Sequence, residues 1–249
     1  MSGISKQKQK YIQSLHNKKY RHQYGVFIVE GRKSIEELLS TDFEIEELFL
    51  IADAASSLEY SGKVELCTAA ELSKVSFVKT NNYGLAIVKM KTAATIIPSH
   101  EAWTLAVDDI NDPGNLGTII RLADWYGIRQ IYCSEQTVDC YNPKVISSTK
   151  GSFGRVDCIY TDLATLFTET QLPVFGAYLN GENVHTFTQY PAAGILLIGS
   201  ESHGISPQLA EFIHTKITIP AFGQAESLNA GVATAILLDN LSRCLSIKG

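Results

Sequence analysis

The stretch WTLAVDDINDPGNLGTIIRLADWYG, residues 103–127, predicts the fold of the second half of the chain. An apolar strand over 103–108 runs into a polar first loop, NDPGN at 111–115, and then into a helix with an apolar stripe. A second loop, GSESHGIS at 199–206, follows the strand GILLI, and a third, PAFGQAESLN at 220–229, follows ITI. Ligands of open parallel α/β sheets bind beyond the carboxyl ends of the strands. The three loops therefore predict one binding site at that edge of a sheet.

Strands and helices alternate through this half of the chain. The strands lack in–out alternation, which indicates a parallel sheet covered by helices on both faces. Residues 1–92 carry a shorter α/β pattern that begins with a polar helix over 4–20, and the aperiodic stretch around Pro98 marks a boundary. We therefore expect domains at 1–92 and 101–249. The strands expected in the second domain are 103–108, 129–133, 173–178, 195–199 and 216–219, with helices near 116–126, 142–150, 162–169, 207–213 and 228–246.

The composition is that of an ordinary globular protein. Hydrophobic residues make up 45% of the 249 residues and charged residues 19%, and no apolar stretch is long enough for a membrane span. The opening residues MSGISKQKQK contain no apolar segment of a signal peptide. Five cysteines without a CxxC pair argue against a disulfide framework and a zinc site. We expect a cytoplasmic protein with no membrane and no metal partner.

The net charge of −5 conceals a basic segment at the N-terminus. Residues 1–33 contain eight lysines and arginines and a single acid, Glu30. Such local concentration is what a polyanion needs, because affinity follows the phosphates neutralised locally. Tyr11, Tyr20 and Tyr24 lie among these charges and favour an RNA-facing surface, since unpaired bases stack on aromatic rings. A solvated, floppy N-terminus is the alternative.

The helix that follows the first loop has two different faces. Asn115 is well placed as its N-cap and Gly127 as the residue after its C-cap. Arg121 points away from the apolar face, as a solvated helix arginine also would. Trp125 lies one turn farther on, and a large outward aromatic suggests a covered surface. We expect this helix at a subunit interface, with Arg121 near its edge.

The second and third loops do not match common catalytic or nucleotide-binding patterns. A nucleophile elbow centred on Ser202 fails, because Ser200 replaces its first glycine and no acid and histidine follow in order. Ser227 can cap the final helix, and Asn229 is either a first-turn helix residue or an amide exposed at the site. With neither a Walker loop nor GxGxxG, the site suits a neutral or zwitterionic cofactor better than ATP.

Taken together and in this order, the junctions resemble the three motifs of the SpoU (TrmH-type) ribose 2′-O-methyltransferases of the SPOUT superfamily. DPGNLGTIIRLADWYG is similar to the first motif, GSESHGIS to the second and IPAFGQAESLNAGVATAILL to the third. NKKYRHQYGVFIVEGRKSIEELL resembles the family's substrate-binding domain. Ser202 replaces the usual glycine, which bears on the loop backbone. Ala230–Gly231 replaces the usual Val–Ser, which bears on packing of the last helix.

The resemblance implies an α/β fold in which a parallel sheet with a C-terminal trefoil knot follows a small α/β, L30e-like substrate-binding domain. It also implies that S-adenosylmethionine binds at the knot, largely through backbone groups. Family members act as homodimers, which agrees with the expectation from Trp125. The cofactor-binding residues implied are Gly199, Ile219 and Leu228, with Tyr178, Leu179 and Gly181 completing the wall.

The family pattern implies that Arg121 positions or activates the ribose 2′-hydroxyl, through the adjacent RNA phosphate. The reference pKa of arginine, about 12.5–13.8, argues against a general base, so we expect Arg121 to orient the hydroxyl and stabilise alkoxide charge. The other catalytic residues implied are Asn115, Glu201, Ser227 and Asn229. The RNA-phosphate contacts expected in the basic segment are Lys18, Lys19 and Arg21.

We therefore expect an S-adenosylmethionine-dependent RNA ribose 2′-O-methyltransferase of two domains that acts as a homodimer. The ribosomal-protein-like N-terminal unit favours rRNA over tRNA by analogy. One alternative is a catalytically inactive RNA-binding protein on the same scaffold, which the departures at Ser202 and Ala230–Gly231 would support. A nucleotide-processing enzyme is a weaker alternative, because the basic segment would then have no purpose.

Overall fold

The computed structural model describes residues 3–91 and 97–248. Its contacts divide the chain into two compact units, one of Met1–Thr92 with Asp139–Arg155 and one of Ala93–Val138 with Val156–Gly249. The segment 139–155 lies in the second half of the sequence but packs with the first unit. Each unit is built around its own sheet.

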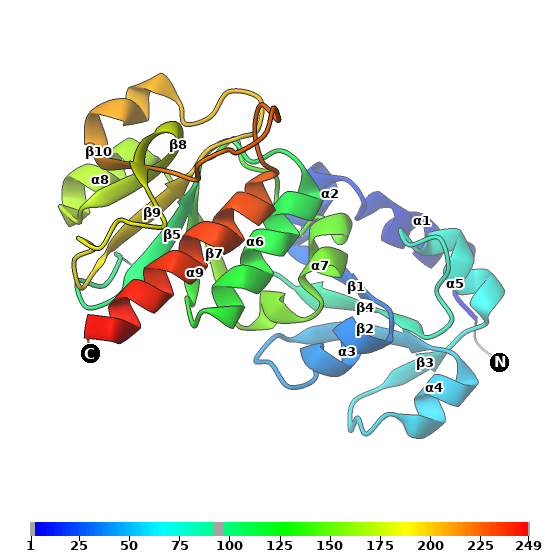
Figure 1. The fold of residues 1–249 in the computed structure, drawn as a ribbon. Coiled ribbons are helices and arrows are strands. Elements are labelled where there is room, and N and C mark those ends of the chain that lie inside the picture. The colour runs from blue at the N-terminus through cyan, green and yellow to red at the C-terminus, as the bar shows by residue number, and fades with distance from the viewer. Residues whose placement is uncertain (1–2, 92–96, 249) are drawn as a thin grey trace. The chain divides into compact units, whose positions relative to one another are not determined.

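The first unit is a four-stranded sheet with helices on both faces (Figure 1). The strand order is β1-β4-β2-β3, antiparallel except for the β2–β3 pair. Alternate residues of β1 enter different cores: Val26 and Ile28 pack with α1 and α5, while Phe27 and Val29 pack with α3, α4 and α7. The elements are α1 Lys6–Ser14, α2 Lys18–Tyr24, β1 Val26–Glu30, α3 Arg32–Leu38, β2 Ile45–Leu50, α4 Ala52–Ser57, β3 Val64–Leu66, α5 Ala69–Val75, β4 Gly84–Lys89, α7 Pro143–Thr149 and the 3-10 turn η1 Ser152–Gly154.

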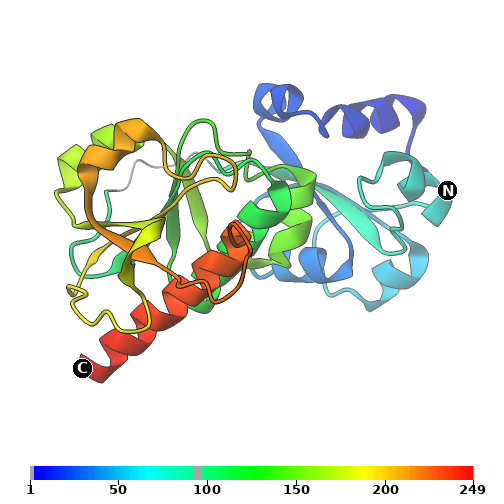
Figure 2. The ribbon, with the colours of Figure 1, turned by 45° about the horizontal axis from the view of Figure 1, so that its top comes forward.

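The polar helix expected over 4–20 is two helices, α1 and α2, on one side of this sheet (Figure 2). The chain breaks because the side chain of Asn17 accepts a hydrogen bond from the backbone of Lys19 and so starts a new helix. Buried Ile12 and Leu15 anchor the first helix. The second helix has a single buried residue, Arg21.

Arg21 is an internal charge and not a surface residue. Only 1% of it is exposed, and its Nε and Nη2 donate to Asp139 Oδ2 at 3.0 and 2.5 Å. Its Nη1 donates to the backbone carbonyls of Leu15 and His16 at 3.0 and 2.9 Å. The expectation that Arg21 contacts RNA phosphate is therefore wrong, because its donors are already used within the fold. The neighbouring Lys18 and Lys19 are exposed.

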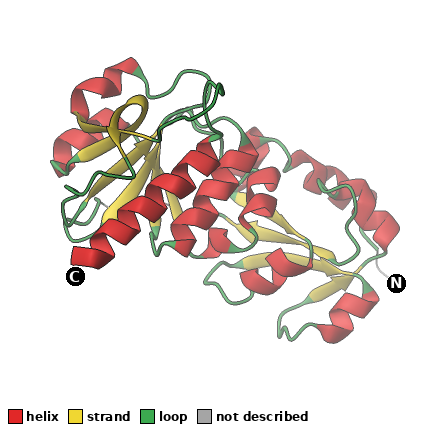
Figure 3. Ribbon diagram, viewed as in Figure 1, coloured by secondary structure: helices red, strands yellow, loops and turns green. Residues whose placement is uncertain are grey.

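The second unit contains the parallel sheet expected from the sequence, in the order β10-β8-β9-β5-β6-β7. On one face α6 and α9 run side by side, and α8 with η2 packs on the other (Figures 1 and 3). Strand β7 was not expected, because only its Ile159 is buried and no apolar run marks it. The elements are β5 Trp103–Val107, α6 Pro113–Trp125, β6 Gln130–Cys133, β7 Asp157–Tyr160, α8 Leu163–Thr170, β8 Val174–Asn183, β9 Gly194–Ile198, the 3-10 helix η2 Pro207–Phe212, β10 Ile213–Thr218 and α9 Ala230–Lys248.

No helix in the described ranges combines the length and the apolar character that crossing a lipid bilayer demands.

The buried ion pair gives a first prediction. Replacing Asp139 by alanine should lower the free energy of unfolding by about 3–5 kcal/mol, because it leaves the Arg21 guanidinium buried without its counter-charge. Urea denaturation measures the change. Glu65→Ala is the control, since the Lys63–Glu65 pair is exposed at the Lys63 end and should contribute at most about 1 kcal/mol. Equal losses in the two variants would contradict the role given to Asp139.

Candidate active site

The three polar loops meet at the carboxyl edge of the second sheet, as the sequence predicts. β5 and β9 are adjacent in the sheet, so the first and second loops leave it side by side. The carboxylate of Asp108, at the end of β5, accepts a hydrogen bond from the backbone N–H of Ser206 at 2.8 Å. Asp108 is 3% exposed, so this bond joins the bases of the two loops away from solvent.

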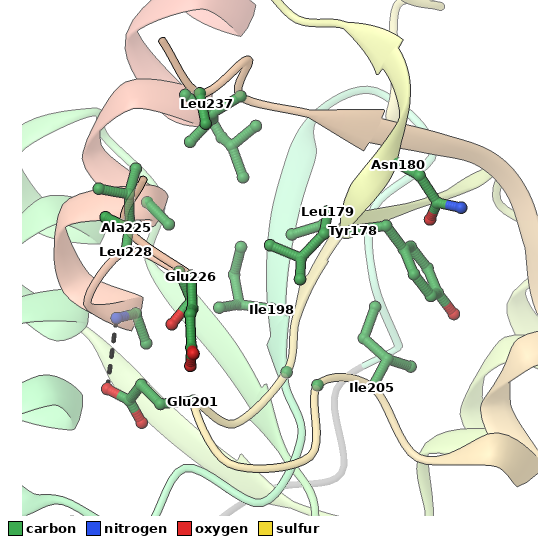
Figure 4. Close-up of a pocket in the computed structure, with 18 of the residues that line it drawn as sticks. Tyr178, Leu179, Asn180, Ile198, Glu201, Ile205, Ala225, Glu226, Leu228 and Leu237 are labelled. Carbon is green, nitrogen blue, oxygen red and sulfur yellow. Dashed lines mark hydrogen bonds between the residues drawn. The ribbon is translucent and has the colours of Figure 1, made fainter. Parts of the chain in front are cut away.

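One side chain, Asn115, connects all three loops. Its Nδ2 donates to Oε1 of Glu201 in the second loop, and its Oδ1 accepts from Nδ2 of Asn229 in the third at 2.7 Å. The same Glu201 oxygen accepts the backbone N–H of Ala230, where α9 begins, at 3.3 Å (Figure 4). A carboxylate at a helix N-terminus is stabilised by the helix dipole. Asn115, Glu201 and Asn229 thus form a closed polar network that holds the loops together.

Asn115 can play this part because it is not the N-cap of α6, contrary to expectation. The helix begins two residues earlier, at Pro113, whose fixed φ and missing N–H suit the first helical position. Asp112 is the cap, and its Oδ1 accepts the backbone N–H of Asn115 at 3.0 Å. The Asn115 side chain is therefore released from capping.

The cap of α9 is also different from the expected one. Oδ1 of Asn229 accepts the backbone N–H groups of Gly231 and Val232 at 3.0 and 3.3 Å. Asn229 therefore does the capping that the sequence assigned to Ser227. Because Asn229 caps through its oxygen and reaches Asn115 through its nitrogen, α9 is tied directly to the loop network.

A cavity of about 740 Å³ opens beside this network, within the range of cofactor sites. An excursion of β8 forms one wall. Gly176 pairs with Lys216 of β10 but the next residue, Ile217, pairs with Glu182, so residues 177–181 leave the ladder. Of the expected cofactor residues, Tyr178, Leu179, Gly199, Ile219 and Leu228 line the cavity, together with Glu201 and Ser227 from the expected catalytic set.

Gly181 does not line the cavity, contrary to the expectation from the sequence. A Cβ at this position would come within 2.4 Å of the backbone oxygen of Lys216. The glycine is needed where the excursion returns to the sheet, because the two strands approach too closely for a side chain. Its role is therefore to let the strands pair next to the cavity, and not to form the cavity wall.

The second loop is a tight turn that depends on two other glycines. Ser200 and Gly204 exchange backbone hydrogen bonds of 3.1 and 2.9 Å, and Gly204 has a φ of 69°. A Cβ on Gly199 would lie 2.2 Å from the Gly204 carbonyl carbon. Ser202 is not among the described residues with positive φ. Serine in place of the family's glycine therefore imposes no backbone strain on the loop.

The second departure from the family pattern also has a structural explanation. Gly231 lies where α9 meets α6, and a Cβ added to it would be 2.9 Å from Cγ2 of Thr118. Ala230 is buried beside it. Glycine at this point lets the two helices approach closely, so the Ala–Gly pair fits the packing.

The cavity combines an apolar interior with carboxylates on one side. Figure 4 shows Glu201 and Glu226 on the wall across from Tyr178 and Asn180. Partial burial raises the pKa of Tyr178 above its ordinary value. Ile198 contributes to the apolar interior. Such a site accepts a flat apolar group and a cationic group in one molecule.

Arg121 stands apart from the loop network. It is exposed on α6, on the same side as Thr118 and Trp125, and it does not line the cavity. Among the described residues it forms no hydrogen bond or ion pair, which leaves its guanidinium available to an anionic partner. Of the expected catalytic residues, Asn115 is hydrogen-bonded to both Glu201 and Asn229, and Ser227 lies in the cavity wall.

Asp108 and Glu226 belong to the site but were not predicted from the sequence. Asp108 carries a detectable signal, since an acid directly after an apolar strand lies at the ligand-binding edge of a parallel sheet. Glu226 carries none, because its place in the cavity depends on the path of an irregular loop. No cluster of three or more potential metal ligands occurs within residues 3–91 and 97–248.

Comparison with known proteins decides the family. The model of the SpoU rRNA Methylase family matches residues 102–239, more than half of the chain, and includes all three loops. The chain belongs to the SpoU rRNA methylase family. The MRM3-like substrate binding domain matches residues 6–86.

Relatives of similar length match nearly the whole chain. The chain is 30% identical to the 23S rRNA (guanosine(2553)-2′-O)-methyltransferase RlmP of Bacillus subtilis, over 97% of this chain and 98% of that one. A TrmH-family structure from Porphyromonas gingivalis is 32% identical, with a TM-score of 0.85 over 97% of this chain and 99% of the other. An AdoMet-bound rRNA methyltransferase from Sinorhizobium meliloti is 27% identical, with a TM-score of 0.86 over 98% and 97%.

The tight second loop gives a prediction for this SpoU site. Gly199→Ala should weaken binding of S-adenosylmethionine roughly tenfold or more, about 1.4 kcal/mol, because the added methyl group forces the turn open. Isothermal titration calorimetry measures the affinity. In the same loop, Ser202→Gly is the matched control and should leave the affinity within about twofold. A Gly199→Ala protein that binds as tightly as the control would contradict this account of the loop.

Proposed function

We propose that the protein transfers the methyl group of S-adenosylmethionine to a ribose 2′-hydroxyl of ribosomal RNA. The observation that carries the proposal is the Asn115–Glu201–Asn229 network, which joins the three SpoU motifs beside a cavity of cofactor size. The unengaged Arg121 lies on the helix that bears Asn115. The rRNA substrate is supported by the rRNA methyltransferases to which the chain is similar and by its MRM3-like substrate binding domain.

The cavity fits S-adenosylmethionine by the chemistry of its lining. Apolar side chains such as Ile198 and Leu228 suit an adenine ring, and the carboxylates of Glu201 and Glu226 suit the cationic groups. Backbone groups of residues 177–181 and of the third loop would make the remaining contacts with the cofactor. When bound, the cofactor supplies an electrophilic methyl group on a sulfonium.

Arg121 acts on the acceptor RNA in this proposal. An exposed guanidinium offers a fork of donors that matches a phosphate, so it can fix the nucleotide whose 2′-hydroxyl reacts. The same charge stabilises the alkoxide that develops as the hydroxyl proton leaves. Asn115, Glu201 and Asn229 contribute by holding the loops, because Asn115 is hydrogen-bonded to both of the others.

The alternative function, a catalytically inactive RNA-binding protein, is no longer supported by the two departures from the family pattern. Its support came from Ser202 and from Ala230–Gly231, and both departures are accommodated, the first without positive φ and the second by close helix packing. We therefore propose that the protein is an active enzyme.

Replacing Arg121 tests the catalytic proposal. Arg121→Ala should lower the rate of methyl transfer to rRNA about 10²- to 10³-fold while the affinity for S-adenosylmethionine stays unchanged, since Arg121 is outside the cavity. Tritiated methyl transfer and calorimetry measure the two quantities. Arg129→Ala, a second exposed arginine of the same unit, is the control and should keep its activity. Activity retained in Arg121→Ala would refute the role.

We further propose that the enzyme is a homodimer built on α6, α9 and the third loop, with the trefoil knot of its family at that interface. Residues 221–229 are all exposed in the single chain. Trp125 and Phe222 are 82% and 96% exposed, and Leu228 and Val232 nearly half. Large apolar side chains gathered on two helices and a loop mark a surface for association.

The dimer is tested by introducing a charge. Trp125→Glu should convert the protein to a monomer in size-exclusion chromatography with light scattering, because the new carboxylate would be buried at the interface without a partner. Phe77→Glu is the control, since Phe77 is 47% exposed in the other unit. If Trp125→Glu keeps the mass of a dimer, or if the unchanged protein is a monomer, this surface is not the interface.

We also place the enzyme in the cytoplasm. All five cysteines are free thiols, as suits a reducing compartment, and ribosomal RNA is found there in cells without a nucleus.

A further inference from the structure

Helix α2 presents a pair of aromatic rings to solvent. Tyr20 and Tyr24 are 37% and 47% exposed, and their rings are stacked with centroids 6.3 Å apart and planes 17° apart. They are four residues apart, so both lie on one face of the helix. The Lys19 ammonium lies 5.9 Å from the centre of the Tyr20 ring. These rings are not core residues, and they form a flat surface that another planar group can extend.

The surface is held rigidly. The buried side of α2 is fixed by the four hydrogen bonds of Arg21. The ring of Tyr24 also packs edge-on against that of Tyr11, with the ring centroids 5.2 Å apart. A ring that is already ordered loses little entropy when a ligand stacks on it. The buried arginine thus acts as a positioning residue for the exposed face of its own helix.

The charge around the rings is positive. No acidic residue occurs before Glu30, and Lys18, Lys19 and His22 are exposed on the same short helix. The nearest acids on other elements are engaged: Asp139 is buried against Arg21, and Glu47 is paired with Lys8 at 2.5 Å. Burial, together with the nearby carboxylates of Glu46 and Glu47, raises the pKa of Tyr11, so these two acids lie near Tyr11.

We propose that Tyr20 and Tyr24 stack on unpaired bases of the RNA substrate while Lys18 and Lys19 neutralise the flanking phosphates. Stacked aromatics beside lysines suit single-stranded RNA, whose bases expose their faces, and do not suit a duplex, whose bases are hidden. The inference rests on the proposed function in taking that RNA as the methylation substrate. Helix α2 then binds the single-stranded part of that RNA.

Binding is measured by fluorescence anisotropy with labelled single-stranded oligouridine and with fully paired RNA of the same length. This titration needs neither cofactor nor methyl transfer, so it can fail or succeed independently of the proposed function. Tyr20→Ala/Tyr24→Ala should weaken single-strand binding about tenfold or more and leave duplex binding unchanged. Tyr20→Phe/Tyr24→Phe keeps the rings and should bind within about twofold of the unchanged protein.

Two further variants separate stacking from charge and from general damage. Lys18→Ala/Lys19→Ala should make RNA binding less dependent on salt, lowering the slope of log affinity against log salt by about 0.7 for each lysine. Tyr20→Ala/Tyr24→Ala should leave this slope unchanged. Leu66→Ala removes a side chain that is 51% exposed on β3, the strand farthest from β1 in the sheet, and should change nothing.

The proposal is overturned if the alanine pair binds single-stranded RNA like the unchanged protein, or if the unchanged protein does not bind it. It is also overturned if Tyr20→Ala/Tyr24→Ala alters the oligomeric mass without altering the affinity for RNA. That result would show that the two rings contact another protein chain. Tyr20→Ala alone leaves the Tyr11–Tyr24 contact intact and guards against misfolding of the double variant. It should show a smaller loss in the same direction.

Discussion

The carboxyl edge of the second sheet depends on a single amide, that of Asn115. Its two ends are bonded to Glu201 and Asn229, so three loops that are distant in sequence behave as one body. A polar network stabilises a structure best when its hydrogen-bonding groups are satisfied, and here the oxygen of Asn229 and the carboxylate of Glu201 also receive backbone N–H groups of α9. Arg121 is on the same helix as Asn115, so the network also fixes where the guanidinium stands relative to the cofactor loops.

Much of the fold could be predicted because it is recorded in local patterns. Apolar strands without alternation indicated a parallel sheet, and Thr68 with Glu71 forms a capping box, a device whose two residues are only three positions apart. Edge strand β7 could not be predicted, because a single buried residue produces no recognisable hydrophobic pattern. The packing of 139–155 with the first unit was equally invisible, because it depends on contacts between residues more than a hundred positions apart.

The candidate site was predictable to the extent that backbone geometry follows from motifs. Gly199 and Leu228, which the resemblance implies as cofactor-binding residues, line the cavity, whereas the N-caps of α6 and α9 were assigned to the wrong residues. A cap depends on which of several polar residues the helix start reaches, and sequence alone ranks such candidates poorly. Arg21 shows the larger difficulty: a basic residue in a basic segment looks like a ligand for phosphate until its buried partner is known.

The ion pair of Arg21 with Asp139 has a consequence for the order of folding during synthesis. Domains usually fold as they leave the ribosome, the N-terminal one first. The first unit cannot do so when residue 92 emerges, because its buried arginine and one of its two cores wait for Asp139, Ile146 and Phe153. Its completion is therefore delayed until residue 155 has been made. Until then Arg21 of the basic helix α2 lacks its Asp139 partner while the chain is still close to ribosomal RNA.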